Sequence, residues 1–151
     1  MPNYKTEAMP EITFAPGEPE DVEVLFRLSR QLIDQYEDVD QIDYEKVLRW
    51  VHRKIETHIK EYVRVMVGGE IAGYYRFQPC DGKMELDDLY ILPSFRSRGI
   101  GTRVLEKCRQ ETDLPIFLYV FVGNVRAIAL YQRMGFRIVK AAGETRYIME
   151  Q

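Results

Sequence analysis

The chain has 151 residues, of which 46% are hydrophobic and 30% charged, and residues 1–151 are expected to form one folded domain. Lys and Arg total 21 against 24 Asp and Glu, and this net charge of −3 argues against a protein built to coat nucleic acid. Two Cys and two His leave little material for metal or thiol chemistry, so no metal site is predicted.

The cysteines and the chain start indicate a reduced environment. Cys80 and Cys108 lie far apart and are predicted to be free thiols, because a disulfide scaffold would carry more cysteines. His52 and His58 fall in one predicted helix, distant in sequence from both thiols, so a Cys–His nucleophile is not expected. No apolar run reaches membrane-helix length, and residues 1–19 lack the apolar core of a signal peptide. We therefore expect a cytoplasmic protein without a membrane partner.

The first part of the chain predicts a short strand followed by two helices. Residues 12–14 are typical of a strand, and a helix is expected from about Pro19, with a second from about Tyr44. Both helices repeat apolar residues at helical spacing. Residues 34–43 between them hold five acidic residues and no basic one, which predicts a helix end and a loop.

The periodicity then changes to two, which is typical of strands. Residues 62–67, 71–77 and 84–92 predict three consecutive antiparallel strands. Gly68-Gly69 and Asp81-Gly82 predict the turns between them.

The last part of the chain returns to helices. Residues 99–111 predict a helix, and the apolar run 115–122 predicts a central strand buried on both faces. Asn124 is expected to cap a further helix that ends before a left-handed Gly135. Two closing strands follow, at 136–139 and 146–149. This order of elements defines a mixed α/β domain with helices covering a sheet.

The segment between the third strand of this group and the next helix predicts an anion site. Pro93 ends the strand, Arg96 and Arg98 make the loop basic, and Gly99 and Gly101 open the helix. The start of a helix presents free N–H groups and a partial positive charge, which together bind phosphate. The alternative is a glycine-rich turn without a ligand. A P-loop pattern is absent, and the third glycine of a dinucleotide fingerprint is replaced by Val104.

Two motifs resemble those of a known family. The first, Arg/Gln-x-x-Gly-x-Gly/Ala, is matched by Arg96, Gly99 and Gly101. The second, Asn-x-x-Ala-x-x-Leu-Tyr-x-x-x-Gly-Phe, is matched by Asn124, Ala127, Leu130, Tyr131, Gly135 and Phe136. With both motifs in order on the expected elements, the chain resembles the GNAT superfamily of N-acetyltransferases over nearly its whole length.

The resemblance implies a fold and a cofactor. The fold is a mixed, mostly antiparallel sheet of six to seven strands, flanked by about four helices, with a central strand pair that splays apart. Acetyl-CoA lies in that opening, its pantetheine arm along one strand and its pyrophosphate on the helix amides, facing residues 117–121. The implied cofactor contacts are Leu89, Tyr90, Ile91, Arg96, Ser97, Arg98, Gly99, Ile100, Gly101, Thr102, Asn124, Ala127 and Tyr131.

The resemblance also implies direct attack of a neutral amine on the thioester, which needs a general base. Glu85 stands at the offset of the family's catalytic glutamate, although it could equally be a surface glutamate. Asp87 shares its face by strand alternation and is the reserve base, with water a third option, whereas Asp88 should face the other way. Tyr131 is the implied proton donor to the departing thiolate; core packing is the alternative.

The acceptor is less defined. In this family the first two helices border the acceptor side, so the acids of 34–43, together with Glu85 and Asp87, suggest a cationic amine. A polyamine, an aminoglycoside-like amine, a lysine or a peptide N-terminus would fit, but a solvated acidic loop is the alternative. Tyr36 and Tyr119 are candidate acceptor contacts, as are Tyr74 and Tyr75 unless these tyrosines pack in the core.

Other functions remain open at this point. A non-catalytic acyl-CoA-binding or regulatory module would keep the phosphate loop but would not need Glu85 or Tyr131. A small nucleotide-binding domain would prefer a nucleotide over CoA. The closing strands could also pair across a homodimer.

Overall fold

The computed structural model describes residues 11–151, so the first ten residues of the segment tested for a signal peptide lie outside the described part. Within residues 11–151, seven strands form one sheet in the order β1-β2-β3-β4-β5-β7-β6. Every neighbouring pair is antiparallel except β4 and β5, which are parallel, and the predicted fold class is confirmed. The strands are β1 (Ile12–Pro16), β2 (Tyr62–Val67), β3 (Glu70–Cys80), β4 (Lys83–Ile91), β5 (Ile116–Phe121), β6 (Arg137–Ala142) and β7 (Arg146–Glu150).

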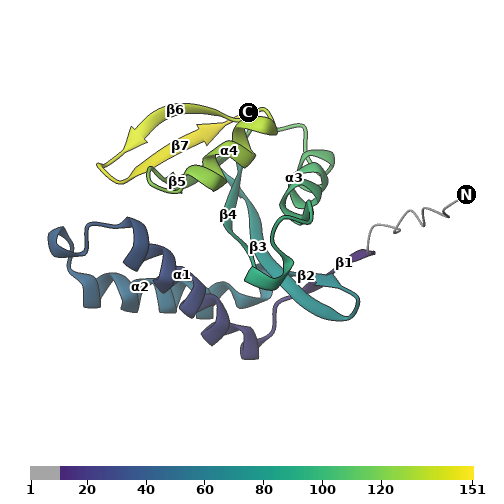
Figure 1. The fold of residues 1–151 in the computed structure, drawn as a ribbon, viewed down its shortest axis with the longest axis horizontal. Coiled ribbons are helices and arrows are strands. Elements are labelled where there is room, and N and C mark those ends of the chain that lie inside the picture. Colours follow the sequence, from purple (N-terminus) through teal and green to yellow (C-terminus); the bar gives the residue numbers. More distant parts are fainter. Residues whose placement is uncertain (1–10) are drawn as a thin grey trace, which may run out of the picture.

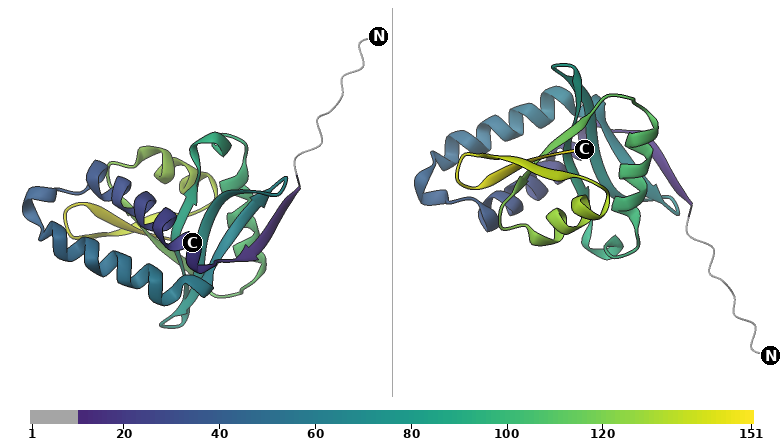
Figure 2. Two further views of the ribbon diagram at one scale, coloured as in Figure 1. Left: turned by 90° about the horizontal axis from the view of Figure 1, so that it is seen from below. Right: turned by 90° about the horizontal axis from the view of Figure 1, so that it is seen from above.

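In the described part of the chain, four α-helices cover the sheet in two pairs. They are α1 (Val22–Tyr36), α2 (Tyr44–His58), α3 (Ile100–Gln110) and α4 (Val125–Arg133). The helices α1 and α2 lie side by side on one side of the sheet, and α3 and α4 lie on the other (Figures 1 and 2). Pro19 begins a 3-10 turn, Pro19–Asp21, rather than the α-helix itself.

Each pair of helices covers its own hydrophobic core. Leu25, Ile55 and Tyr74 belong to the core under α1 and α2, whereas Tyr75 and Val104 belong to the core under α3 and α4. Neighbouring strand residues point to opposite faces, which explains how one sheet serves both cores. Tyr74 and Tyr75 are each 1% exposed, so they pack in the core and do not line an acceptor pocket.

The parallel pair β4–β5 separates soon after it begins. Its register consists of Met84 opposite Ile116 and Glu85 opposite Phe117. Beyond Glu85, β4 continues to pair with β3 as far as Ile91, but not with β5. The predicted splayed strand pair is therefore present, and it leaves backbone N–H and C=O groups of β4 free to bond a ligand.

The prediction that 115–122 forms a strand buried on both faces is wrong on one face. Leu118 and Val120 are buried against the core of α3 and α4. Tyr119, on the other face, is 46% exposed. A continuous apolar run predicts a strand, but it does not show whether helices cover both faces of that strand. Here the face that carries Tyr119 is left uncovered.

The prediction that Asp88 faces away from Asp87 is also wrong. Between β3 and β4, Arg76 pairs with Asp87 and Tyr74 pairs with Tyr90, so β4 carries one extra residue there. Asp88 has a φ of 51° within this bulge. Because the extra residue interrupts the alternation, both carboxylates face α2, and each lies 3.1 Å from Lys54 Nζ.

Local signals that do not depend on the alternation are confirmed. The Asn124 side chain accepts a hydrogen bond from Ala127 N at 3.3 Å and caps α4, and Gly135 has a φ of 93° beyond that helix. Cys80 and Cys108 are both free. Within residues 11–151, the helices are all too short or too polar to span a bilayer, and the acidic, Cys and His side chains form no cluster able to hold a metal ion.

Candidate functional site

A cleft of about 680 Å³ opens where β4 leaves β5. Its walls come from four elements distant in sequence: α1, the end of β4, the loop and start of α3, and α4. Because α1 belongs to one core and α3 and α4 to the other, the cleft lies where the two halves of the molecule meet.

The floor of the cleft is the last part of β4. Leu89, Tyr90 and Ile91 line it, directly after the bulge. The Arg96 Nε donates a hydrogen bond to the Ile91 carbonyl at 3.2 Å, which fixes the loop against the end of the strand. A ligand lying here could therefore bond to strand backbone without displacing another strand.

The end of the cleft that is suited to bind phosphate is the start of α3. Gly99 has a φ of 76°, a backbone conformation natural to glycine, and a Cβ built there would have no neighbour within 4 Å. Ser97 also has a positive φ, 63°, so the loop folds sharply before the helix. The first residues of α3 line the open cleft beside Arg96, as an anion site at a helix start requires.

The opposite wall is α4, whose residues Asn124, Ala127 and Tyr131 line the cleft. The Tyr131 ring packs edge-on against Phe136, with ring centroids 5.8 Å apart. Burial raises the pKa of Tyr131 to about 12, and no charged neighbour contributes to that shift. Its hydroxyl is therefore protonated at neutral pH and able to donate a proton or a hydrogen bond.

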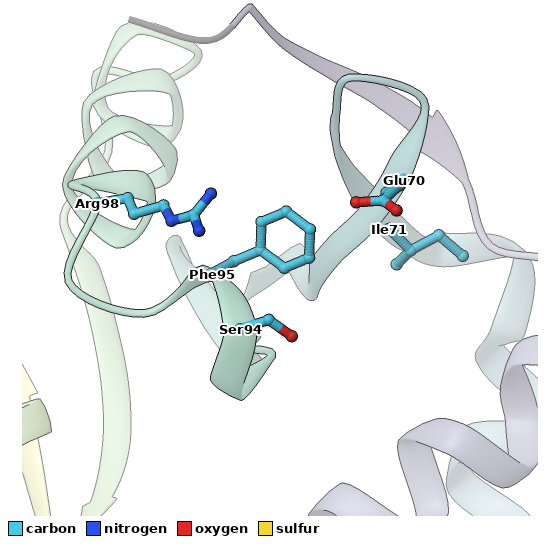
Figure 3. A pocket seen from close by; sticks show the side chains of 5 residues that line it. All are labelled: Glu70, Ile71, Ser94, Phe95 and Arg98. Carbon is cyan, nitrogen blue, oxygen red and sulfur yellow. The ribbon is translucent and has the colours of Figure 1, made fainter.

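Arg98 is the one predicted cofactor contact whose side chain lies elsewhere. It lines a separate shallow hollow of about 620 Å³ with Glu70, Ile71, Ser94 and Phe95 (Figure 3). Its guanidinium lies 5.4 Å from the centre of the Phe95 ring. The other twelve predicted cofactor contacts line the main cleft.

Asp87 lies on the α2 side of β4, two residues before the cleft-lining Leu89. Its carboxylate is 3.1 Å from Lys54 Nζ and 3.7 Å from Arg76 Nη1. Burial and then the charge of Asp88 raise the pKa of Asp87 to about 6, although Lys54 opposes the shift. A carboxyl group of this kind can exchange a proton near neutral pH.

Within the described residues, the remaining predicted side chains divide between the cleft and the open face of the sheet. Tyr36 lines the cleft and stacks on Phe121 with centroids 5.9 Å apart. Tyr119 lies outside it, with the Arg146 guanidinium 5.4 Å from its ring centre. Glu85 also lies outside the cleft and accepts a hydrogen bond from Gln78 Nε2 at 3.3 Å.

Sequence reasoning missed two groups of lining residues. Arg126 and Arg133 of α4 add two cations to the cleft, and Gln31 and Gln35 of α1 add two amides. Their spacings of seven and four residues place each pair on one helical face, which is a signal that the sequence does contain. What it could not tell is which face of each helix meets the cleft.

Taken together, a splayed parallel pair, an amide-lined helix start and a cationic helix wall define a site for an elongated, phosphate-bearing ligand. The chain belongs to the acetyltransferase (GNAT) family, whose family model matches residues 25–136. The members of this family are enzymes that use acetyl-CoA.

Three characterised relatives show how far this similarity extends. The chain is 26% identical over 146 residues to the spore coat polysaccharide biosynthesis protein SpsD of Bacillus subtilis, covering 89% of this chain but 50% of that protein. It is 27% identical over 100 residues to the spermine/spermidine N(1)-acetyltransferase of Bacillus subtilis, covering 54% and 62%. It is 30% identical over 119 residues to an N-alpha-acetyltransferase of Sulfurisphaera tokodaii, covering 61% and 71%. The chain thus spans about half to two thirds of the first two relatives.

Solved structures share the fold. An acetyltransferase from Thermus thermophilus superposes with a TM-score of 0.70 at 24% identity, covering 95% of this chain and 97% of that one. The PaiA N-acetyltransferase of Thermoplasma acidophilum, in complex with coenzyme A, superposes with a TM-score of 0.69 at 20% identity, covering 93% and 98%.

The residues of this cleft fit acetyl-CoA. The open space beside Gly99 leaves room for a pyrophosphate on the α3 amides. Arg96, Arg126 and Arg133 supply positive charge for phosphate groups. The free side of β4 offers the backbone groups that an amide-containing pantetheine arm requires.

Proposed function

We propose that this protein catalyses transfer of the acetyl group of acetyl-CoA to a primary amine within a ternary complex. The observation that carries the proposal is one cleft in which an amide-lined helix start, a free strand edge and a protonated phenol converge. Bound acetyl-CoA would supply an activated thioester, and the protein would supply position and proton transfer.

The protein's own groups divide the binding work. The start of α3 and Arg96 would hold the pyrophosphate, and Arg126 and Arg133 would hold the remaining phosphate charge. The Leu89 to Ile91 backbone would align the arm so that the thioester points toward the acceptor side. Such alignment means that translational and rotational entropy is lost when the substrates bind rather than in the transition state, which lowers the barrier.

A carboxylate on the α2 side of β4 would accept the proton of the attacking amine. The sequence favours Glu85 and holds Asp87 in reserve; neither carboxylate lines the cleft, and the pKa of about 6 supports Asp87 as a base near neutral pH. Glu85 lies on the same strand and contributes to the raised pKa of Asp87, so the two carboxylates are best tested together.

Tyr131 would donate a proton or hydrogen bond to the departing thiolate. Its position on α4 within the cleft supports this role, and its raised pKa keeps the hydroxyl protonated as a hydrogen-bond donor. A phenol with a raised pKa holds its proton more tightly than a thiol does, so it would act chiefly by donating a hydrogen bond to the developing thiolate.

We propose a cationic amine as the acceptor. The exposed acids between α1 and α2 support this class, as does the similarity to a spermine/spermidine acetyltransferase. The similarity to an N-alpha-acetyltransferase supports a peptide N-terminus as the second candidate. Lys54 and Arg76 already pair with Asp87, so the attraction for a cation would come from Glu85 and the acidic loop.

The deciding experiment is release of CoA thiol from acetyl-CoA across a panel of polyamines, aminoglycosides, lysine derivatives and peptides. Turnover with one class identifies the acceptor. Binding of CoA without turnover on any amine would support a regulatory acyl-CoA module instead, and tighter binding of a nucleotide than of CoA would contradict both.

We also propose, from the sequence, that the closing strands could pair across a homodimer. The strand β6 is an edge strand whose residues are largely exposed, so it could pair with a second copy. Lys140 and Arg137 on that edge oppose pairing. Light scattering coupled to size exclusion would measure the mass directly.

A further inference from the structure

Asp88 occupies an unusual place in the fold. It is an aspartate in the middle of a strand with a φ of 51°, and its side chain is 14% exposed. Tyr62 Oη donates to its carboxylate at 2.5 Å, and Tyr90 Oη does so at 3.1 Å. Lys54 Nζ lies 3.1 Å away and neutralises the charge. A left-handed conformation costs an aspartate some free energy, which these three contacts offset.

The network joins three elements to the bulge. Tyr62 belongs to β2, Lys54 to α2 and Tyr90 to β4 itself. Burial lowers the pKa of Lys54, but Asp88 and Asp87 outweigh that effect and keep the ammonium charged. Burial and Asp88 raise the pKa of Tyr62, so this phenol remains a donor.

Tyr90 connects this network to the cleft. Its side chain lines the cleft, and its hydroxyl also hydrogen-bonds Ser29 Oγ of α1 at 2.7 Å. The same residue therefore ties the bulge to the floor of the cleft and to the helix that borders it. A shift of the bulge would therefore move Tyr90, and with it the floor of the cleft and the adjoining part of α1.

We propose that Asp88 is a positioning residue: its carboxylate, held by Tyr62, Tyr90 and Lys54, fixes the β4 bulge and so places the backbone of residues 89–91 against the acetyl donor. The effect of Asp88 on catalysis rests on the proposed function. Its direct effect is on the affinity for coenzyme A, which is measured without turnover. Without the bulge, the strand would pair regularly with β3 and each later side chain would change face.

The test compares two variants of Asp88 with a matched control. Asp88→Gly removes the carboxylate while relieving the left-handed backbone, and Asp88→Asn keeps the shape without the charge. Asp81→Gly makes the same change at an exposed aspartate with a φ of 50° in the β3–β4 turn, far from the network. Coenzyme A dissociation constants are measured by calorimetry, and melting temperatures are measured beside them.

We expect both Asp88 variants to bind coenzyme A about tenfold or more weakly, and Asp81→Gly to bind as the wild type. In turnover assays the KM for acetyl-CoA should rise more than the KM for the amine. Wild-type coenzyme A affinity in Asp88→Gly, even with a lower melting temperature, would overturn the proposal, because a purely structural role moves stability alone.

Tyr62→Phe keeps the experiment decisive if the Asp88 variants fail to fold. It removes one hydrogen bond to the carboxylate and should weaken coenzyme A binding several-fold; unchanged affinity would contradict the network's role. Since binding is measured without turnover, a wild-type protein that binds coenzyme A but acetylates no amine would refute the proposed function while leaving this inference testable.

Discussion

The buried Tyr131 and the half-buried Asp87 hold their protons more tightly than the same groups do in water. Burial alone raises the pKa of Tyr131 to about 12, and burial with the charge of Asp88 raises that of Asp87 to about 6. The first group is thereby kept as a donor, and the second can act as an acceptor above its pKa. Both pKa values are raised, but Tyr131 is thereby suited to donate and Asp87 to accept.

Tyr131→Phe tests the donor. Turnover should fall by about 10² or more, because the thiolate would leave without its hydrogen-bond donor, while coenzyme A affinity should stay within about twofold. Steady-state kinetics and calorimetry measure the two quantities. Tyr147→Phe, on β7 outside the cleft, is the control. Unchanged turnover in Tyr131→Phe would remove the tyrosine from the mechanism.

The acid limb of the pH–rate profile tests the base. Asp87 must be ionised to accept a proton, so kcat/KM should rise with pH and level off above about 6. Asp87→Asn should lower the rate and abolish that limb, and Glu85→Gln is measured in parallel. A limb that persists in Asp87→Asn and disappears in Glu85→Gln would transfer the role to Glu85.

The same carboxyl group affects stability. Its pKa is higher in the folded chain than its ordinary 3.8, so folding favours the protonated form. The free energy of unfolding contributed by this group is therefore greatest at low pH and falls as the pH rises from about 4 to about 6. Urea unfolding at both pH values should show a smaller decline in Asp87→Asn than in the wild type.

The strands β3 and β4 approach each other closely at Gly73 and the cleft-lining Tyr90. A Cβ at Gly73 would lie 2.2 Å from the Tyr90 carbonyl oxygen, which is backbone and has no free space to move. This glycine therefore sets how close β3 can come to the floor of the cleft.

Gly73→Ala should destabilise the protein by about 3 kcal/mol and weaken coenzyme A binding, because β4 must move away. Gly82→Ala is the matched control: it has a φ of 77° and no neighbour within 4 Å, so it should cost about 1 kcal/mol and leave affinity unchanged. Thermal unfolding and calorimetry separate the two. Equal losses of affinity would show that the close approach does not govern the floor.

Which parts of the structure are visible in the sequence depends on the range of the interactions involved. The helix cap at Asn124 and the left-handed Gly135 follow from local chemistry and were predictable. The bulge at Asp88 was not, because one inserted residue leaves the polar and apolar pattern of a short strand unchanged. The direction of Arg98 and the open face of Tyr119 depend on tertiary packing that no local pattern encodes.

Across the molecule, the C-terminal end of α1 bridges to the second half of the sheet. Tyr36 stacks on Phe121, and Thr145 Oγ1 donates to Glu37 Oε1 at 2.7 Å. The cleft is therefore lined by both halves, and a ligand within it would contact elements that belong to separate cores.

Coenzyme A should consequently stabilise the whole chain. At a hundred times its dissociation constant, the gain in unfolding free energy is about 2.7 kcal/mol, and one cooperative transition should shift to higher temperature. Calorimetric scans with and without coenzyme A measure this shift. Added salt should reduce it by screening Arg96 and Arg126, and adenosine, which lacks phosphates, should give a much smaller shift. Separate transitions for the two halves would contradict the bridging role.

The start of α3 would bind phosphate through main-chain N–H groups rather than through side chains. Every residue type except proline supplies the same group, so most substitutions at Ile100 or Thr102 would leave the donors in place. Gly99 and Ser97 have positive φ and resist replacement for a backbone reason, and a Cβ at Gly101 would lie 3.0 Å from Leu130 Cδ2. A library of single substitutions across this loop should therefore show broad tolerance at Ile100 and Thr102 and intolerance centred on Gly99. Such degeneracy allows the same recognition to persist while the surrounding sequence diverges.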